Sequence, residues 1–182
     1  MCKLTILIPT LTSRKHFLDR LIDVIGGQCK QIDTKIFILE DRGEETIGHK
    51  KNHLLDKCET EYCAFIDDDD LVSSDYVERV HEGINKGVDV VTFKGIITSE
   101  GKKPETFIHK LGLKYTEQKG IYFRPPNHLN PMKVELARQV KFPETSFGED
   151  ADFAKRMAES GLLKTEYFID QPMYFYQYRR NK

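Results

Sequence analysis

The first half of the chain alternates short apolar segments with segments whose apolar residues recur at helical spacing. Strands are expected at residues 3–9, 35–40, 62–66 and 88–97, and helices at 17–25, 46–57 and after Asp75. Gly26 and Gly27 are expected to end the first helix. This alternation predicts an α/β fold in which a mostly parallel central sheet is flanked by helices on both faces.

The second half has a less regular pattern. Short strand-like pieces at 105–111 and 119–125 lead into a proline-bounded loop and a short helix at 132–139. A further helix is expected near Gly148, and two separate strand pieces at 166–170 and 173–179 close the pattern. No repeat, linker or low-complexity segment divides the sequence, so one domain over residues 1–182 is expected.

Composition excludes several classes of protein. The formal net charge of −1 provides no overall field for nucleic acid or an anionic membrane, so tight nucleic-acid binding is not expected. The apolar runs are too short for a transmembrane segment, and no signal peptide is recognised. The four cysteines form neither a CxxC pair nor a zinc pattern. A cytoplasmic protein with free thiols is therefore expected.

Four consecutive carboxylates, Asp67 to Asp70, follow the third expected strand. Ligands of open parallel sheets bind beyond the carboxyl ends of the strands, where this run is expected to lie. If the run is extended, Asp67 and Asp69 face the same side and together suit Mg²⁺ or Mn²⁺. The alternative is a solvated turn whose acids favour the N-terminus of the following helix.

Two further motifs contain charged groups suited to catalysis or phosphate binding. Glu149 and Asp150 begin an expected helix. Either one of these carboxylates is held there as a general base, or both simply complement the helix dipole. Lys51 lies early in a helix that is expected to start at the same sheet edge. A cation there either contacts a diphosphate or belongs to a solvated helix face.

These motifs occur in the order found in family 2 glycosyltransferases of the GT-A fold, which the sequence resembles over about residues 3–180. The matching segments are "LTILIPTLTSR", "FILEDRG", "GHKKN", "FIDDDDLVSSDYV", "FGEDADFAKRM" and "YFYQYRRNK". The resemblance implies a GT-A-like domain with a donor-nucleotide half over about 1–96 and an acceptor and catalytic half over about 97–182. A lysine at position 51, where the family usually has arginine, would keep charge but lose the bidentate grip on phosphate.

The resemblance also implies roles for individual residues. The donor nucleotide would contact Pro9, Asp41, Lys51, Asp67 and Asp68. Mn²⁺ or Mg²⁺ would be held by Asp69, Asp67 and Asp70. Asp150 would be the catalytic base, with Glu149 beside it. The acceptor or phosphate side would include His128, Asn130, Arg179 and Arg180, although a proline-bounded turn capped by Asn130 explains that loop equally well.

The implied activity is metal-dependent, inverting transfer of a sugar from a nucleoside-diphosphate sugar to an acceptor hydroxyl. A carboxylate at Asp41 accepts a hydrogen bond from a base N–H, which favours a UDP- or GDP-sugar. The donor sugar, the acceptor glycan or other hydroxyl, the oligomeric state and the length of the native chain are left open by the sequence.

Two other functions are compatible with parts of the sequence. A haloacid-dehalogenase-like phosphohydrolase also has Asp-x-Asp after a strand, but there the motif closes the first strand and is followed by threonine rather than Leu71. A non-catalytic module that binds a sugar nucleotide or a glycan would share the fold, although it needs no Glu149–Asp150 pair.

Overall fold

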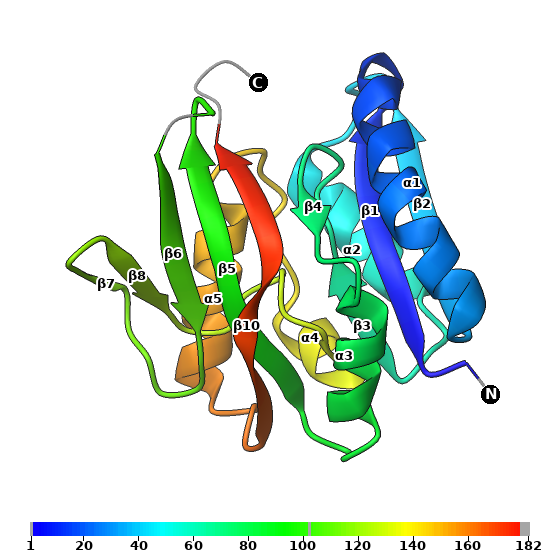
Figure 1. The fold of residues 1–182 in the computed structure, drawn as a ribbon. Coiled ribbons are helices and arrows are strands. Elements are labelled where there is room, and N and C mark those ends of the chain that lie inside the picture. Colours follow the sequence, from blue (N-terminus) through cyan, green and yellow to red (C-terminus); the bar gives the residue numbers. More distant parts are fainter. Residues whose placement is uncertain (1, 102, 179–182) are drawn as a thin grey trace.

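The computed structural model describes residues 2–101 and 103–178, and its ribbon is drawn in Figure 1. The helices, including a short 3-10 turn named η1, are η1 (Thr12–Arg14), α1 (Lys15–Gln31), α2 (Ile47–Lys57), α3 (Tyr76–Ile84), α4 (Val134–Val140) and α5 (Glu149–Ser160). The strands are β1 (Leu4–Leu11), β2 (Thr34–Asp41), β3 (Tyr62–Phe65), β4 (Leu71–Val72), β5 (Val90–Ser99), β6 (Pro104–His109), β7 (Thr116–Gln118), β8 (Ile121–Arg124), β9 (Met132–Lys133) and β10 (Glu166–Tyr178).

The ten strands found among the described residues form one mixed sheet with the order β2-β1-β3-β9-β5-β6-β8-β7, and β10 pairs with β5 and β4. The β2-β1-β3 group and the long β5-β10 pair are parallel. The short strand β9 joins these two parallel groups and is antiparallel to both β3 and β5. The antiparallel strand β9 therefore connects the two parallel groups, which lie on the right and left of Figure 1.

Helices cover both faces of the sheet, as the alternating sequence pattern predicts. Leu4, Ile6 and Ile8 of β1 belong to a core cluster with buried side chains of α1 and α3, whereas Leu7 belongs to a second cluster with α2, α4 and α5. Adjacent residues of a strand point to opposite faces. The nearly continuous apolar character of β1 and β3 thus follows from burial on both sides.

The first helix does not end at Gly26 and Gly27, and this expectation is wrong. Helix α1 continues to Gln31 because contacts beyond the glycines hold its last turns. The Gln28 side chain donates to Ser73 O at 3.0 Å and accepts from Val77 N at 3.0 Å, and Cys29 is buried in the core. These tertiary contacts outweigh the low helix propensity of glycine.

Two strand expectations also need correction. Strand β2 is at the edge of the sheet and is only partly buried, so the expectation of a buried strand at 35–40 is wrong. The two pieces expected at 166–170 and 173–179 form the single strand β10, which follows β5 through register shifts on both sides of Pro172. A proline lacks the N–H that a regular ladder requires, and the irregularity lets the strand continue past it.

Among residues 2–101 and 103–178, no helix has both the length and the apolar composition needed to cross a lipid bilayer.

Helix α2 holds the segment that leads into α5. Gly48 N donates to Thr145 O at 3.0 Å, and the Asn52 side chain exchanges two hydrogen bonds with the backbone of Phe142. A Cβ added at Gly48 would lie 1.8 Å from Pro143 O, so only glycine allows this approach. The "GHKKN" segment therefore determines where Glu149 and Asp150 enter the fold.

Replacing Gly48 with alanine should destabilise the protein by about 1–3 kcal/mol, because backbone atoms of Pro143 block the added methyl group. Gly27→Ala is the matched control, since Gly27 is also inside a helix and an added Cβ meets nothing within 4 Å. The control should be neutral or stabilising by up to about 1 kcal/mol. Urea unfolding measures both variants, and equal free energies of unfolding would contradict the close contact.

Candidate active site

The four aspartates form a turn at the carboxyl end of β3. Asp70 N donates to Asp67 O at 3.1 Å, which closes a β-turn over residues 67–70. The expectation of an extended run, in which Asp67 and Asp69 share one side, is therefore wrong in its premise. Within this turn Asp68 and Asp69 both lie at Arg14, Asp70 contacts β10, and Asp67 lines a cavity.

Arg14 provides positive charge for the middle of the run. Its guanidinium contacts both oxygens of Asp68, with Nη2 at 2.5 Å from Oδ1 and Nε at 3.0 Å from Oδ2. The same Nη2 lies 3.1 Å from Asp69 Oδ1, and Thr10 Oγ1 donates to Asp68 Oδ2 at 2.6 Å. Hydrogen bonding to Asp68 raises the pKa of Arg14, so the guanidinium stays charged. Both carboxylates are nearly inaccessible to solvent, and the paired charge compensates their loss of hydration.

Asp70 points into the fold toward β10. Its Oδ2 accepts from the Tyr174 hydroxyl at 2.9 Å and its Oδ1 accepts from Gln177 N at 2.8 Å. The Tyr174 oxygen in turn accepts from Asp67 N at 3.2 Å. Burial raises the pKa of Asp70 well above its usual range, and the charge of Asp67 adds to this effect. Asp70 therefore fixes the turn against the last strand, and both its oxygens are engaged there.

The acid at the end of β2 pairs with a lysine of α2. Lys50 Nζ lies 2.6 Å from Asp41 Oδ1 and also donates to Thr10 O at 3.0 Å. Asp41 Oδ2 accepts from Glu45 N at 3.0 Å. Burial alone would raise the pKa of Asp41, but Lys50 and nearby backbone N–H groups outweigh it and lower the pKa. Pro9 is buried in β1, in register with Leu39 of β2.

The next lysine of α2 reaches the start of α5. Lys51 Nζ donates to Glu149 Oε1 at 3.0 Å, and the lysine side chain is only 1% exposed. Its Nζ also lies 5.4 Å from the centre of the Phe142 ring. Lys51 thus neutralises the buried Glu149, which is the residue directly before Asp150 in the chain.

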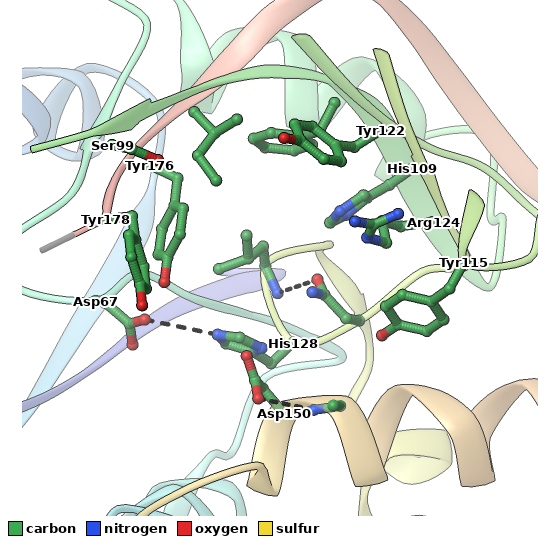
Figure 2. A pocket seen from close by; sticks show the side chains of 15 residues that line it. Asp67, Ser99, His109, Tyr115, Tyr122, Arg124, His128, Asp150, Tyr176 and Tyr178 are labelled. Carbon is green, nitrogen blue, oxygen red and sulfur yellow. Dashed lines mark hydrogen bonds and ion pairs between the residues drawn. The ribbon is translucent and has the colours of Figure 1, made fainter. Parts of the chain in front are cut away.

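Asp67 and Asp150 line the same cavity, which has a volume of about 400 Å³. Figure 2 shows them near His128, with the Tyr176 and Tyr178 side chains beside Asp67 and the Tyr115, Tyr122 and Arg124 side chains across the cavity. Asp67 belongs to the turn after β3 and Asp150 to the first turn of α5, so the fold brings together two acids separated by more than eighty residues. The cavity therefore contains carboxylates in an otherwise largely aromatic wall.

The loop before β9 contributes one of its two expected residues to this cavity. His128 lines it, with Nε2 at 3.7 Å from Asp67 Oδ2, and neither ring nitrogen has a hydrogen-bond partner among the described residues. Asn130 is fully buried behind the wall, where its Oδ1 accepts from Asn127 N and from His109 Nδ1. Asn130 thus holds the loop and fixes the His109 tautomer. Arg179 and Arg180 lie outside the described residues.

Sequence reasoning missed Arg14, Arg124 and the tyrosines of the cavity. Arg14 follows β1 at the same sheet edge as the aspartates, which was a usable signal. Arg124 and Tyr176 were read only as parts of strands. Within residues 2–101 and 103–178, no group of three or more His, Cys, Asp or Glu side chains is arranged to hold a metal ion.

The buried His109 should make stability depend on pH. Burial lowers its pKa from 6.5 to about 4, whereas in the unfolded chain it titrates near its ordinary value. The native state therefore binds fewer protons, so its stability is complete above pH 6.5 and falls as the pH drops toward 4. This group should account for a loss of roughly 3 kcal/mol across that window.

His109→Gln is the variant that isolates this effect. Glutamine keeps an N–H donor for Asn130 but does not titrate, whereas His81, whose pKa is also lowered, is present in both proteins. Urea unfolding at pH 7, 6 and 5 should show a steeper loss of stability for the wild type than for the variant. Parallel pH dependences would contradict a buried, neutral His109.

Comparison with known proteins agrees with this architecture. The model of the family described as glycosyl transferase family 2 matches residues 18–143. Among solved structures, S. aureus TarS 1-349 in complex with UDP-GlcNAc has a TM-score of 0.68 at 14% identity, covering 99% of this chain and 60% of that one. The complex of TarS 1-349 with UDP has a TM-score of 0.65 at 15% identity, covering 96% of this chain and 60% of that one.

A further similar structure, A197 from STIV, has a TM-score of 0.52 at 16% identity and covers 92% of this chain and 82% of that one. No curated protein matches the sequence. The chain spans about 60% of the length of TarS 1-349. At these identities the similar structures show the fold alone, and they confirm the expected GT-A-like α/β fold. Because the family model covers well over half of its residues, the chain belongs to glycosyl transferase family 2.

Proposed function

We propose that this protein is a metal-dependent, inverting glycosyltransferase that moves a sugar from a nucleoside-diphosphate sugar to an acceptor hydroxyl. The observation that carries the proposal is the shared cavity of Asp67 and Asp150 in a chain of this family. One carboxylate follows a strand of the β2-β1-β3 group and the other begins α5, and both lie near His128 in the cavity. That arrangement suits a donor and an acceptor that meet between them.

The donor nucleotide would lie over residues 1–96, within a single domain that spans 1–182, and the acceptor would lie over 97–182. Asp41 would accept a hydrogen bond from a base N–H, favouring uracil or guanine, because carboxylate oxygens accept more than one hydrogen bond. Lys50 keeps Asp41 charged and in place for this role. Pro9 and Asp68 would shape the floor of the nucleotide site, Asp68 through its hold on Arg14.

Mn²⁺ or Mg²⁺ would be held by Asp67, whereas Asp69 is nearly inaccessible to solvent and lies against Arg14. The described residues offer no complete protein cage, but these ions need only one or two carboxylates when substrate phosphates complete the shell. Asp67 fits that requirement because its carboxylate opens into the cavity. Asp70 is left out of this proposal because Tyr174 and Gln177 already use both its oxygens. When bound, the metal would stabilise negative charge on the leaving diphosphate.

Asp150 would act as the general base. Its carboxylate takes the proton of the acceptor hydroxyl while that oxygen forms a bond with the anomeric carbon and the bond from that carbon to the diphosphate oxygen breaks. A single displacement of this kind inverts the anomeric carbon. Lys51 would assist by pairing with Glu149, since an uncompensated charge at Glu149 would disfavour ionised Asp150. This assigns Lys51 to the base rather than to direct contact with the donor phosphates.

The two alternatives are weaker. The phosphohydrolase motif closes the first strand of its fold, whereas Asp67 to Asp70 follow β3 in a chain of another family. A non-catalytic binding module remains an outcome of the experiment on Asp150.

Binding of a nucleoside diphosphate should require the metal. In a thermal-shift panel of nucleoside diphosphates, UDP or GDP should raise the melting temperature with Mn²⁺ present and have little effect in EDTA. Asp67→Asn should weaken this binding by about tenfold or more, because a neutral amide is a poorer ligand for a hard cation. Asp23→Asn, an exposed change on α1, controls for the loss of one negative charge. Equal stabilisation in EDTA would refute the metal requirement.

Asp150→Asn should reduce sugar transfer by about 10²-fold or more while leaving folding and diphosphate affinity intact. Asparagine keeps the shape and N-terminal capping ability of aspartate but cannot take the proton. Asp152→Asn is the matched control, because Asp152 is also in the first turn of α5 but pairs with Arg156 on the surface. A wild-type rate with a lower melting temperature in Asp150→Asn would assign this acid to capping. Donor binding without any transfer or hydrolysis in the wild type would support the binding module.

A further inference from the structure

The guanidinium of Arg124 is held firmly on the wall of the cavity. Its Nη1 donates to Thr116 O at 3.0 Å and to Phe123 O at 2.8 Å. Its central carbon lies 5.0 Å from the ring centre of Tyr115 and 5.1 Å from that of Tyr122. Two hydrogen bonds and two aromatic contacts therefore fix the plane of the group before any ligand arrives.

One edge of this guanidinium is not used by the protein. Arginine has five N–H donors, and the two on Nη1 account for both carbonyl contacts. Among the described residues, Nε and Nη2 have no acceptor, and no carboxylate lies within 4.0 Å of the group. The contacts to Thr116 and Phe123 explain how Arg124 stabilises the β7–β8 hairpin, but they do not explain an open Nε–Nη2 edge in a cavity wall.

The charges in the cavity are separated. Figure 2 shows Asp67 and Asp150 together on one side and the Arg124 nitrogens across the cavity from them, beside His109. Hydrogen bonding to Asn130 leaves His109 with its proton on Nδ1, and burial keeps it neutral at pH 7, so it adds no second positive charge beside Arg124.

We propose that the Nε–Nη2 edge of Arg124 binds an anionic group, a phosphate or a carboxylate, carried by the acceptor. Two parallel N–H donors match the two oxygens of such a group, and this bidentate contact is stronger than one with a neutral partner. An acceptor bound there can place a hydroxyl toward Asp150. The carboxylates of Asp67 and Asp150 would repel the acceptor's anionic group and so keep it at Arg124. The inference rests on the proposed function and names the class of acceptor for that site.

The test uses the wild-type protein labelled with ¹⁵N and follows the Arg124 Nε–H resonance, assigned by its absence from Arg124→Lys. The probes are methyl glucoside, methyl glucuronide and glucose 6-phosphate, which are neutral, carboxylate-bearing and phosphate-bearing. At least one charged probe should shift this resonance and bind about tenfold more tightly than the neutral probe. The charged probe that binds with the higher affinity identifies which anion the site prefers.

Arg124→Gln should remove the preference for charged probes. Arg124→Lys should retain part of this preference, because lysine keeps the positive charge but lacks the two parallel N–H donors of the guanidinium. Lys119→Gln removes one positive charge from the exposed turn of the same hairpin and should change nothing. If Arg124→Gln fails to fold, the wild-type resonance and Arg124→Lys still decide the question. Equal affinity of the neutral and charged probes, or unchanged selectivity in Arg124→Gln, would overturn the inference.

A titration with UDP or GDP and Mg²⁺ in the same samples separates this inference from the proposed function. Absence of nucleoside-diphosphate binding by the wild type would count against the proposed function, whatever the anionic probes do. Diphosphate binding without a preference for charged probes would overturn only the anionic acceptor. A shift of the Arg124 resonance on diphosphate binding would assign this edge to the donor and likewise overturn the inference.

Discussion

Repulsion among four consecutive carboxylates is the constraint around which the site is organised. Charges this close in a partly buried turn destabilise the fold unless nearby cations or hydrogen-bond donors compensate them. Arg14 compensates Asp68 and Asp69, whereas Tyr174 and Gln177 of β10 hold Asp70. The turn is thereby fixed from two sides, by the segment after β1 and by the last strand, and the carboxylate that remains at the cavity is Asp67.

Much of the architecture could be predicted from the sequence because it depends on local periodicity. The strands β1, β3 and β5 and the helices α1, α2 and α3 all occur where the apolar pattern indicates them. The errors arise where distant contacts decide the outcome. Nothing within 17–31 reveals that Gln28 bonds to Ser73 and Val77, and these bonds carry α1 past its two glycines.

The candidate site likewise combines features that the sequence reveals with features that depend on contacts between distant residues. An uninterrupted acidic run after a buried strand is visible in the sequence, but the turn that residues 67–70 form is not. Arg14 and Asp68 are 54 residues apart, so no local pattern relates them. Arg124 and Tyr176 read as ordinary strand residues because alternation predicts which face a side chain occupies and not which cavity that face borders.

Helix α2 connects the two halves of the proposed reaction. Lys50 and Lys51 are neighbours in sequence but are about 100° apart around the helix, so they reach different partners. Lys50 binds Asp41 at the end of β2, and Lys51 binds Glu149 at the start of α5. Both ammonium groups are buried, and removal of either would leave a carboxylate without its cation. Gly48 and Asn52 also hydrogen-bond to the segment before α5. One helix end thus positions Asp41, the proposed donor-binding acid, relative to Asp150, the proposed base.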